Sequence, residues 1–178
     1  RFRCGGLHLN WFVIEESAIP QKNQGSDARM TIISLTLGFA SERMAEFWIT
    51  PANENIGAWK GHWGLSEIER LRLRCIADSL IASRYCLSSD DVRHILHGCD
   101  HTASITTENN PKGFWRVDKD KDPEFRHTVL TLIAFHDLEE KIHACGGDRE
   151  KGIKAFLNQN DGEGWMIPET LCLADYNL

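Results

Sequence analysis

The stretch from Ser66 to Arg84, SEIERLRLRCIADSLIASR, carries the clearest secondary-structure signal in the chain. Its apolar residues are spaced so that they fall on one side of an α-helix, as a buried stripe does. They are Ile68, Leu71, Cys75, Ile76 and Leu80. Ser66 followed by Glu69 is typical of a capping box, which satisfies backbone N–H groups at a helix start. The stretch therefore predicts an amphipathic helix over residues 66 to 84.

A second helix is predicted directly after the first. Ser88 precedes Asp90 and Asp91, whose carboxylates suit the positive end of a helix dipole. Its apolar side consists of Val92, Ile95 and Leu96. Gly98 then ends it, because glycine favours the residue just past a helix. The two helices together predict a helical hairpin.

Two more helices are predicted further along the chain. Asp122 precedes Pro123, and proline suits the first helical position because its missing N–H has no helical partner there. This third, long helix is expected to be capped by Asp122 and to run to about residue 144. Its expected core face consists of Val129, Leu132, Ile133, Leu138 and Ile142. Asp148 is the expected cap of a fourth, short helix that ends near residue 157.

The residues before position 65 favour short strands. Residues 7–19 and 31–39 are rich in β-branched, aromatic or alternating apolar side chains, which predicts two strands. A short helix capped by Ser41 follows in residues 41–47. The expected fold class is mainly α with a small β portion, an α+β arrangement. We expect an N-terminal strand and loop region over residues 1–64, the end of a preceding domain, and a helical C-terminal domain over residues 65–178.

Composition indicates a soluble globular chain. It has 178 residues, of which 42% are hydrophobic and 26% charged, and its apolar runs are too short to span a bilayer. The formal net charge is −6, which argues against general polyanion binding and leaves room only for local nucleic-acid contacts. The first residue is Arg1 and no secretory leader follows, so we expect a segment of a longer protein.

The cysteines indicate a reducing compartment. All six lie far apart, with no C-x-x-C pair and none of the dense spacing found in secreted scaffolds. We expect them to be reduced and mostly buried, and Cys75 to act as a small apolar residue in its helix. The expected localisation is cytoplasmic.

Two clusters have some resemblance to metal sites. Four potential zinc ligands lie within eight residues, but no second ligand pair follows at the expected spacing. They are His94, His97, Cys99 and His101. The second cluster is Asp118, Asp120 and Asp122, which copy the start of a calcium loop. Pro123 and Val129 stand where that loop needs glycine and glutamate, so we expect a solvated charged turn. No metal is expected at either place.

A basic and aromatic stretch is the candidate nucleic-acid contact. It consists of Lys112, Phe114, Trp115, Arg116, Lys119, Lys121 and Arg126. Cationic side chains can hold phosphates, and aromatic rings can stack on bases. The alternative is that Phe114 and Trp115 anchor a loop whose lysines are merely solvated. A similar stripe of Glu67, Arg70, Arg74 and Asp78 is expected to pair its own charges in water.

Three long blocks of sequence carry a family resemblance. They are GGLHLNWFVIEESAIPQ from Gly5, LSEIERLRLRCIADSLIASRYCLSSDDVRHIL from Leu65 and PKGFWRVDKDKDPEFRHTVLTLIAFHDLEEKI from Pro111. In this order they resemble the C-terminal region of large adenine-specific DNA methyltransferases of the type IIG kind. Such enzymes belong to bacterial restriction-modification and phage-defence systems. The tail from Gly146 to Asp175 continues the resemblance, which covers most of the chain.

The resemblance implies a role in DNA methylation without a catalytic centre in this segment. In the family, a preceding catalytic domain binds S-adenosylmethionine and flips adenine out of the duplex, and the following region recognises DNA. The cofactor-binding glycine motif and the Asn-Pro-Pro-aromatic motif have no matching positions here. We therefore expect no catalytic, cofactor-binding or metal-binding residue in this chain, and no activity from it alone. The expected partners are double-stranded DNA, reached through the parent chain, and the preceding methyltransferase domain, with no membrane.

Loops rather than helices are the expected DNA contacts, because a helical platform can hold loops in place. The candidate DNA-binding residues are Asn10, Trp11, Lys112, Arg116, Lys119 and Lys121. Two alternatives stay open. A helical protein–protein docking module of a defence complex would account for the acidic balance. A small metalloenzyme would require metal held by His94, His97 and Cys99.

Overall fold

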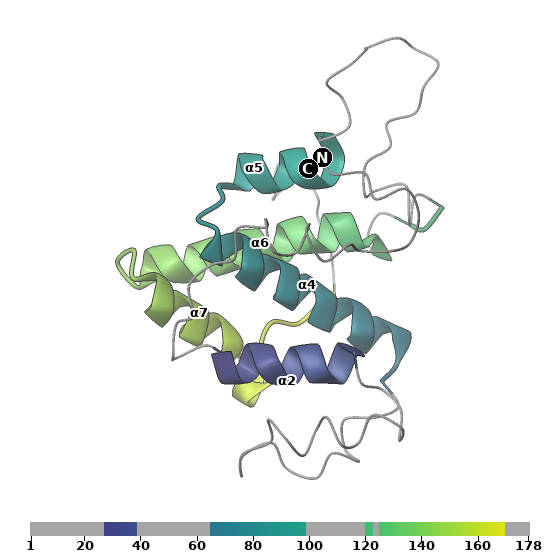
Figure 1. Cartoon of the computed structure of the whole chain (residues 1–178), viewed down its shortest axis with the longest axis horizontal. Coiled ribbons are helices and arrows are strands. Elements are labelled where there is room, and N and C mark those ends of the chain that lie inside the picture. Colours follow the sequence, from purple (N-terminus) through teal and green to yellow (C-terminus); the bar gives the residue numbers. More distant parts are fainter. Residues whose placement is uncertain (1–26, 39–64, 99–119, 123–124, 170–178) are drawn as a thin grey trace, which may run out of the picture.

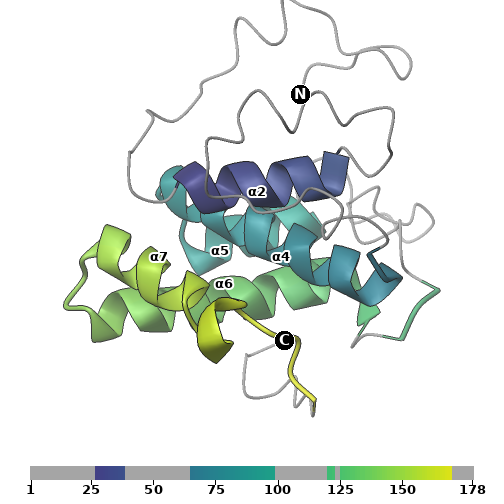
Figure 2. The ribbon, with the colours of Figure 1, turned by 90° about the horizontal axis from the view of Figure 1, so that it is seen from below.

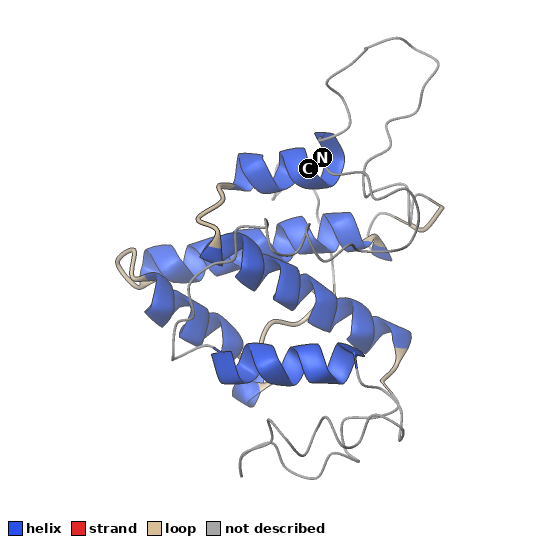
Figure 3. Cartoon of the chain, in the orientation of Figure 1, coloured by secondary structure: helices blue, strands red, loops and turns tan. Residues whose placement is uncertain are grey.

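The computed structural model describes residues 27–38, 65–98, 120–122 and 125–169, and within these ranges it contains helices and no strand (Figures 1 and 3). The α-helices are α2 (Asp27–Gly38), α4 (Glu67–Arg84), α5 (Ser89–Arg93), α6 (His127–Ala144) and α7 (Arg149–Leu157). A π-helical turn, η3 (His94–Gly98), continues α5, and a 3-10 turn, η6 (Asn160–Gly162), follows α7. Among the described helices, none combines the length and apolar character needed to cross a bilayer.

Helix α6 lies at the centre of the described part. It packs against α4, α5 and α7, and α2 lies on the far side of α4 (Figures 1 and 2). This position explains why α6 is buried around most of its circumference. All five residues of its predicted core face are buried, and so are Leu130, Ala134 and Phe135. A helix enclosed by three neighbours has no broad solvent face to keep polar.

The start of α4 confirms the predicted Ser66 cap but lacks the second half of the predicted capping box. Ser66 Oγ accepts a hydrogen bond from the Glu69 N–H at 3.2 Å. The Glu69 carboxylate instead accepts hydrogen bonds from the Arg72 guanidinium, at 2.7 and 2.5 Å. Of the predicted stripe, Cys75, Ile76 and Leu80 are buried and Leu71 is half-buried, but Ile68 is 52% exposed. The expectation that Ile68 joins the core was therefore wrong.

The second helix begins where the sequence predicts. Ser88 and Asp91 form a complete capping box, and the hydrogen bonds from Ser88 hold the pKa of the Asp91 carboxyl below its ordinary value. Val92 and Leu96 are buried against Ala82 of α4 and residues of α6. Ile95 was expected on the same apolar side, but it is 39% exposed. Helix α6 thus packs against both helices of the pair.

The third helix begins later than predicted. Its first residue is His127 and its N-cap is Arg126, whose side chain makes no capping hydrogen bond. Asp122 instead belongs to a turn, since its carbonyl accepts a hydrogen bond from the Phe125 N–H at 2.9 Å. The prediction that Asp122 caps this helix was therefore wrong. The helix end is as predicted, because Gly146 and Gly147 have φ of +70° and +81°.

The fourth helix confirms its predicted cap. Asp148 accepts a hydrogen bond from the backbone N–H of Lys151 at 3.0 Å, and this bond lowers the pKa of the Asp148 carboxyl. The helix then ends at Leu157, as expected.

Helix α2 corrects the prediction of a strand over residues 31–39. Met30, Ile33 and Leu37, spaced three and four residues apart, pack on the core beside α4. The Arg70 guanidinium donates to the Leu37 carbonyl at 2.9 Å, which satisfies a group that a helix end leaves open. These contacts outweigh the β preference of the branched residues, because tertiary packing routinely overrides propensity. The other predicted strand, residues 7–19, and the helix over 41–47 lie outside the described residues.

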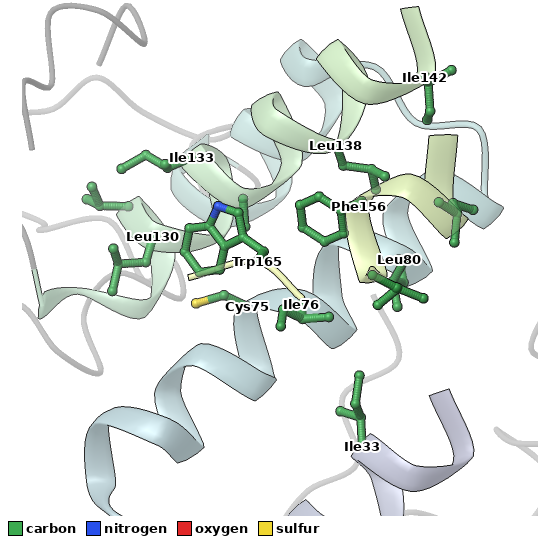
Figure 4. Close-up of a cluster of buried hydrophobic side chains, with 14 residues drawn as sticks. Ile33, Cys75, Ile76, Leu80, Leu130, Ile133, Leu138, Ile142, Phe156 and Trp165 are labelled. Atoms are coloured by element: carbon green, nitrogen blue, oxygen red, sulfur yellow. The ribbon is translucent and has the colours of Figure 1, made fainter. Parts of the chain in front are cut away.

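The core joins all the longer helices of the described part (Figure 4). Ile33 of α2, Ile76 of α4, Leu138 of α6 and Phe156 of α7 belong to one buried cluster, which also contains Trp165. Of the cysteines in the described ranges, Cys75 is buried, Cys145 is partly buried and Cys86 is exposed, and all three are free thiols. Helix α2 lies inside the range 1–64, yet it packs as part of this helical body.

Candidate functional site

A groove of about 660 Å³ opens between α4 and the α5–η3 segment. The N-terminal turns of α6 contribute His127 and Thr131 to it. Most of its other lining is apolar: Leu71, Ile81, Ala82, Tyr85, Leu87, Val92, Ile95 and Leu96. A second hollow of about 630 Å³ adjoins it and shares Leu71, Arg74 and Lys121.

Exposed apolar side chains gather at these two hollows. Ile81, Tyr85 and Ile95 line the groove with exposed fractions of 42%, 44% and 39%. Ile68 and Phe125, which are about half exposed, line the second hollow. Among the described residues, only one other large hydrophobic side chain is exposed, and it lies elsewhere. Clustered exposed apolar side chains are typical of interaction surfaces.

Two of the charged side chains in the predicted stripe on α4 have partners on other helices. Asp78 Oδ2 lies 2.9 Å from His127 Nε2 on α6, and Arg70 donates to the Leu37 carbonyl of α2. The expectation that Glu67, Arg70, Arg74 and Asp78 pair among themselves was therefore wrong for Arg70 and Asp78. Sequence periodicity within one helix could not reveal either partner, since both come from other helices. Arg74 is exposed on the groove side of α4.

Lys121 is the one predicted DNA-binding residue within the described part. It is exposed and lines both hollows. Its carbonyl accepts a hydrogen bond from Arg126 Nε at 2.9 Å, which ties this position to the start of α6. The other five candidates lie outside the described residues, namely Asn10, Trp11, Lys112, Arg116 and Lys119. Phe114 and Trp115 lie outside them too.

The predicted metal clusters are only partly within the described ranges. His94 and His97 lie in η3, and Cys99 and His101 are outside. Asp120 and Asp122 are exposed, as expected for a solvated turn, and Asp118 is outside.

A different group of possible ligands lies on α6. Ligand atoms of His136, Asp137 and Glu140 lie within 4.8 Å of one another. The Asp137 carboxylate accepts a hydrogen bond of 2.7 Å from the indole N–H of Trp165, so it already has a structural role. Sequence analysis missed this group, although its spacing of one and three residues on a helix was the available signal.

No family model matches the chain, and neither a curated protein nor a solved structure matches it.

Proposed function

We propose that this chain is a DNA-recognition and supporting segment of an S-adenosylmethionine-dependent, adenine-specific DNA methyltransferase. In this role it holds a DNA-contacting loop and leaves methyl transfer to the catalytic domain of the same protein. The three sequence blocks that resemble the C-terminal region of such enzymes support the assignment. The acidic net charge of −6 is compatible with it only if DNA contacts are local.

The position of Lys121 is the observation that carries the proposed role. Lys121 is the last of the candidate DNA-binding cations that begin at Lys112, and it is exposed and lines the groove. Its backbone is tied by Arg126 to the start of α6, the central helix. Fixed in this way to the start of a rigid helix, Lys121 presents its cation in a defined place, which is what phosphate positioning requires.

Each part of the proposed protein has a separate task. S-adenosylmethionine, bound by the catalytic domain, supplies the methyl group. The helical body of this chain supplies a rigid base through the core around Trp165. Lys112, Arg116, Lys119 and Lys121 contact the DNA backbone and fix the register of the duplex relative to the catalytic domain.

Loss of these cations tests the proposal. In the intact protein, replacing Lys112, Arg116, Lys119 and Lys121 by alanine is expected to weaken binding of an adenine-containing duplex by roughly tenfold or more at physiological salt. The slope of log affinity against log salt is expected to become shallower, since fewer counterions are released. Fluorescence anisotropy with a labelled duplex over a salt series measures both effects.

The matched control removes the same charge elsewhere. Arg93, Lys141, Lys151 and Lys154 lie on α5, α6 and α7, away from the groove lining, and are replaced together by alanine. This variant is expected to keep most of its DNA affinity. Equal weakening in both variants would mean that only net charge matters, and no weakening in the first would refute the loop contact. Binding of S-adenosylmethionine, measured by calorimetry, serves as the check that each protein is folded.

A further inference from the structure

The side of α4 that lines the groove has a symmetric sequence. Six residues that are exposed or half-buried follow one another along it at intervals of four, three, four, three and four. They are Glu67, Leu71, Arg74, Asp78, Ile81 and Tyr85. Alternating steps of three and four residues keep side chains on one narrow strip of a helix, as at a coiled-coil seam. Read in reverse, the strip has the same spacing, and its midpoint lies level with Ile76, whose own side chain is buried in the core.

The chemistry of this strip is complementary to itself. When a second copy of α4 lies antiparallel across the first, about a twofold axis at Ile76, each residue meets a suitable counterpart. Leu71 meets Ile81 of the second copy, so two apolar side chains are covered. Arg74 meets Asp78, which brings opposite charges together. Glu67 lies opposite Tyr85. A twofold interface needs this self-complementarity.

The burial and charges of these side chains are compatible with such a contact. Ile81 and Tyr85 are 42% and 44% exposed, so apolar area is available to be covered. The Asp78 side chain is 46% exposed although Oδ2 contacts His127, which leaves Oδ1 for an incoming guanidinium. Arg74 is exposed, and no described residue makes an ion pair with it. The 18 residues of α4 extend about 27 Å and contain five of the six residues, and the sixth, Tyr85, is the C-cap.

We propose that two copies of this chain associate through the groove-lining side of α4, antiparallel, with Arg74 of each copy paired to Asp78 of the other. The occupant of this face is thus a second copy, because its order of apolar and charged residues matches its own reverse. The inference does not rest on a role in DNA methylation. Binding of an unrelated acidic or basic helix would not require the sequence of this strip to be symmetric.

Charge reversal tests the pairing directly. Arg74→Asp places two acidic residues at the centre of the seam in each copy, and Asp78→Arg places two basic ones there. Each variant alone is expected to weaken self-association by roughly tenfold or more, because like charges then face each other. The double variant Arg74→Asp/Asp78→Arg is expected to associate again. An equimolar mixture of the two single variants is expected to form a heterodimer.

Sedimentation velocity of the intact protein over a micromolar concentration series measures these states, and circular dichroism checks that each variant is helical. Lys154→Asp on α7 is the control for charge change away from the seam, and it is expected to associate as the unaltered protein does. A protein that is monomeric throughout the series would overturn the proposal. So would a dimer that both single variants leave intact, or single variants that are folded but do not associate when mixed.

Discussion

Replacing Gly152 by alanine is expected to lower the free energy of unfolding by about 3 kcal/mol, the upper part of the range for overpacking. A Cβ at this position of α7 would lie 2.5 Å from both Cα and Cγ1 of Ile142 on α6, and 2.8 Å from its backbone nitrogen. Two of these atoms belong to the backbone, so the helices must separate to admit a methyl group. Because α6 and α7 pack closely here, the separation would also disturb Phe156 and Leu138 in the core.

The direction of this change in stability distinguishes a closely packed glycine from an exposed one. In an exposed helix interior, glycine to alanine stabilises a protein by up to about 1 kcal/mol. Gly38, at the end of α2, is the matched control, since a Cβ there meets no atom of the described residues within 4 Å. Urea unfolding followed by circular dichroism is expected to separate the two variants clearly. Equal stability of Gly152→Ala and Gly38→Ala would contradict the close packing of α6 against α7.

Replacing Arg72 by methionine is expected to cost about 3 kcal/mol of stability, as for one partner removed from a buried ionic and polar network. Arg72 is a buried residue of α4. Its Nη1 donates to the carbonyls of Glu163 and Trp165, at 3.0 and 2.8 Å, and the rest of the guanidinium binds Glu69. Methionine has a similar length but no donor, so two carbonyls and a carboxylate would lose their partner together.

The loss of stability in Arg72→Met is expected to loosen residues 163–165 in particular. The Trp165 indole lies in the core and donates to Asp137, so loosening of residues 163–165 is expected to change the tryptophan emission spectrum. Arg93→Met on the exposed side of α5 is the control, and its effect is expected to stay within about 0.5 kcal/mol. If Arg72→Met is as stable as this control, then the guanidinium does not hold the segment after α7.

Local signals predicted most helix boundaries well. Ser66, Ser88 and Asp148 cap their helices, and glycines at 146 and 147 end α6, because these effects depend on a few neighbouring residues. The other features depend on contacts between residues far apart in the sequence, which local signals do not indicate. Helix α2 has β-favouring residues and is helical through its packing on α4, and Ile68 has a core-like position in the pattern but lies at a hollow.

The candidate site was predictable only in part. The candidate cations from Lys112 to Lys121 can be recognised in the sequence, but the groove that Lys121 lines depends on how α4, α5 and α6 meet. The partner of Asp78 is His127, about fifty residues away, and no pattern within α4 indicates it. The buried role of Arg72 was missed for the same reason, because its acceptors at Glu163 and Trp165 come from the segment after α7.

Methyl transfer to adenine tests the proposed function most directly. The intact protein that contains this chain is incubated with labelled S-adenosylmethionine and an adenine-containing duplex, and N6-methyladenine is measured by mass spectrometry. A duplex in which adenine is already methylated at N6 is the control. We expect N6-methyladenine with the intact protein and none with residues 1–178 alone. An intact protein that is folded and binds S-adenosylmethionine but does not methylate the duplex would refute the proposed function.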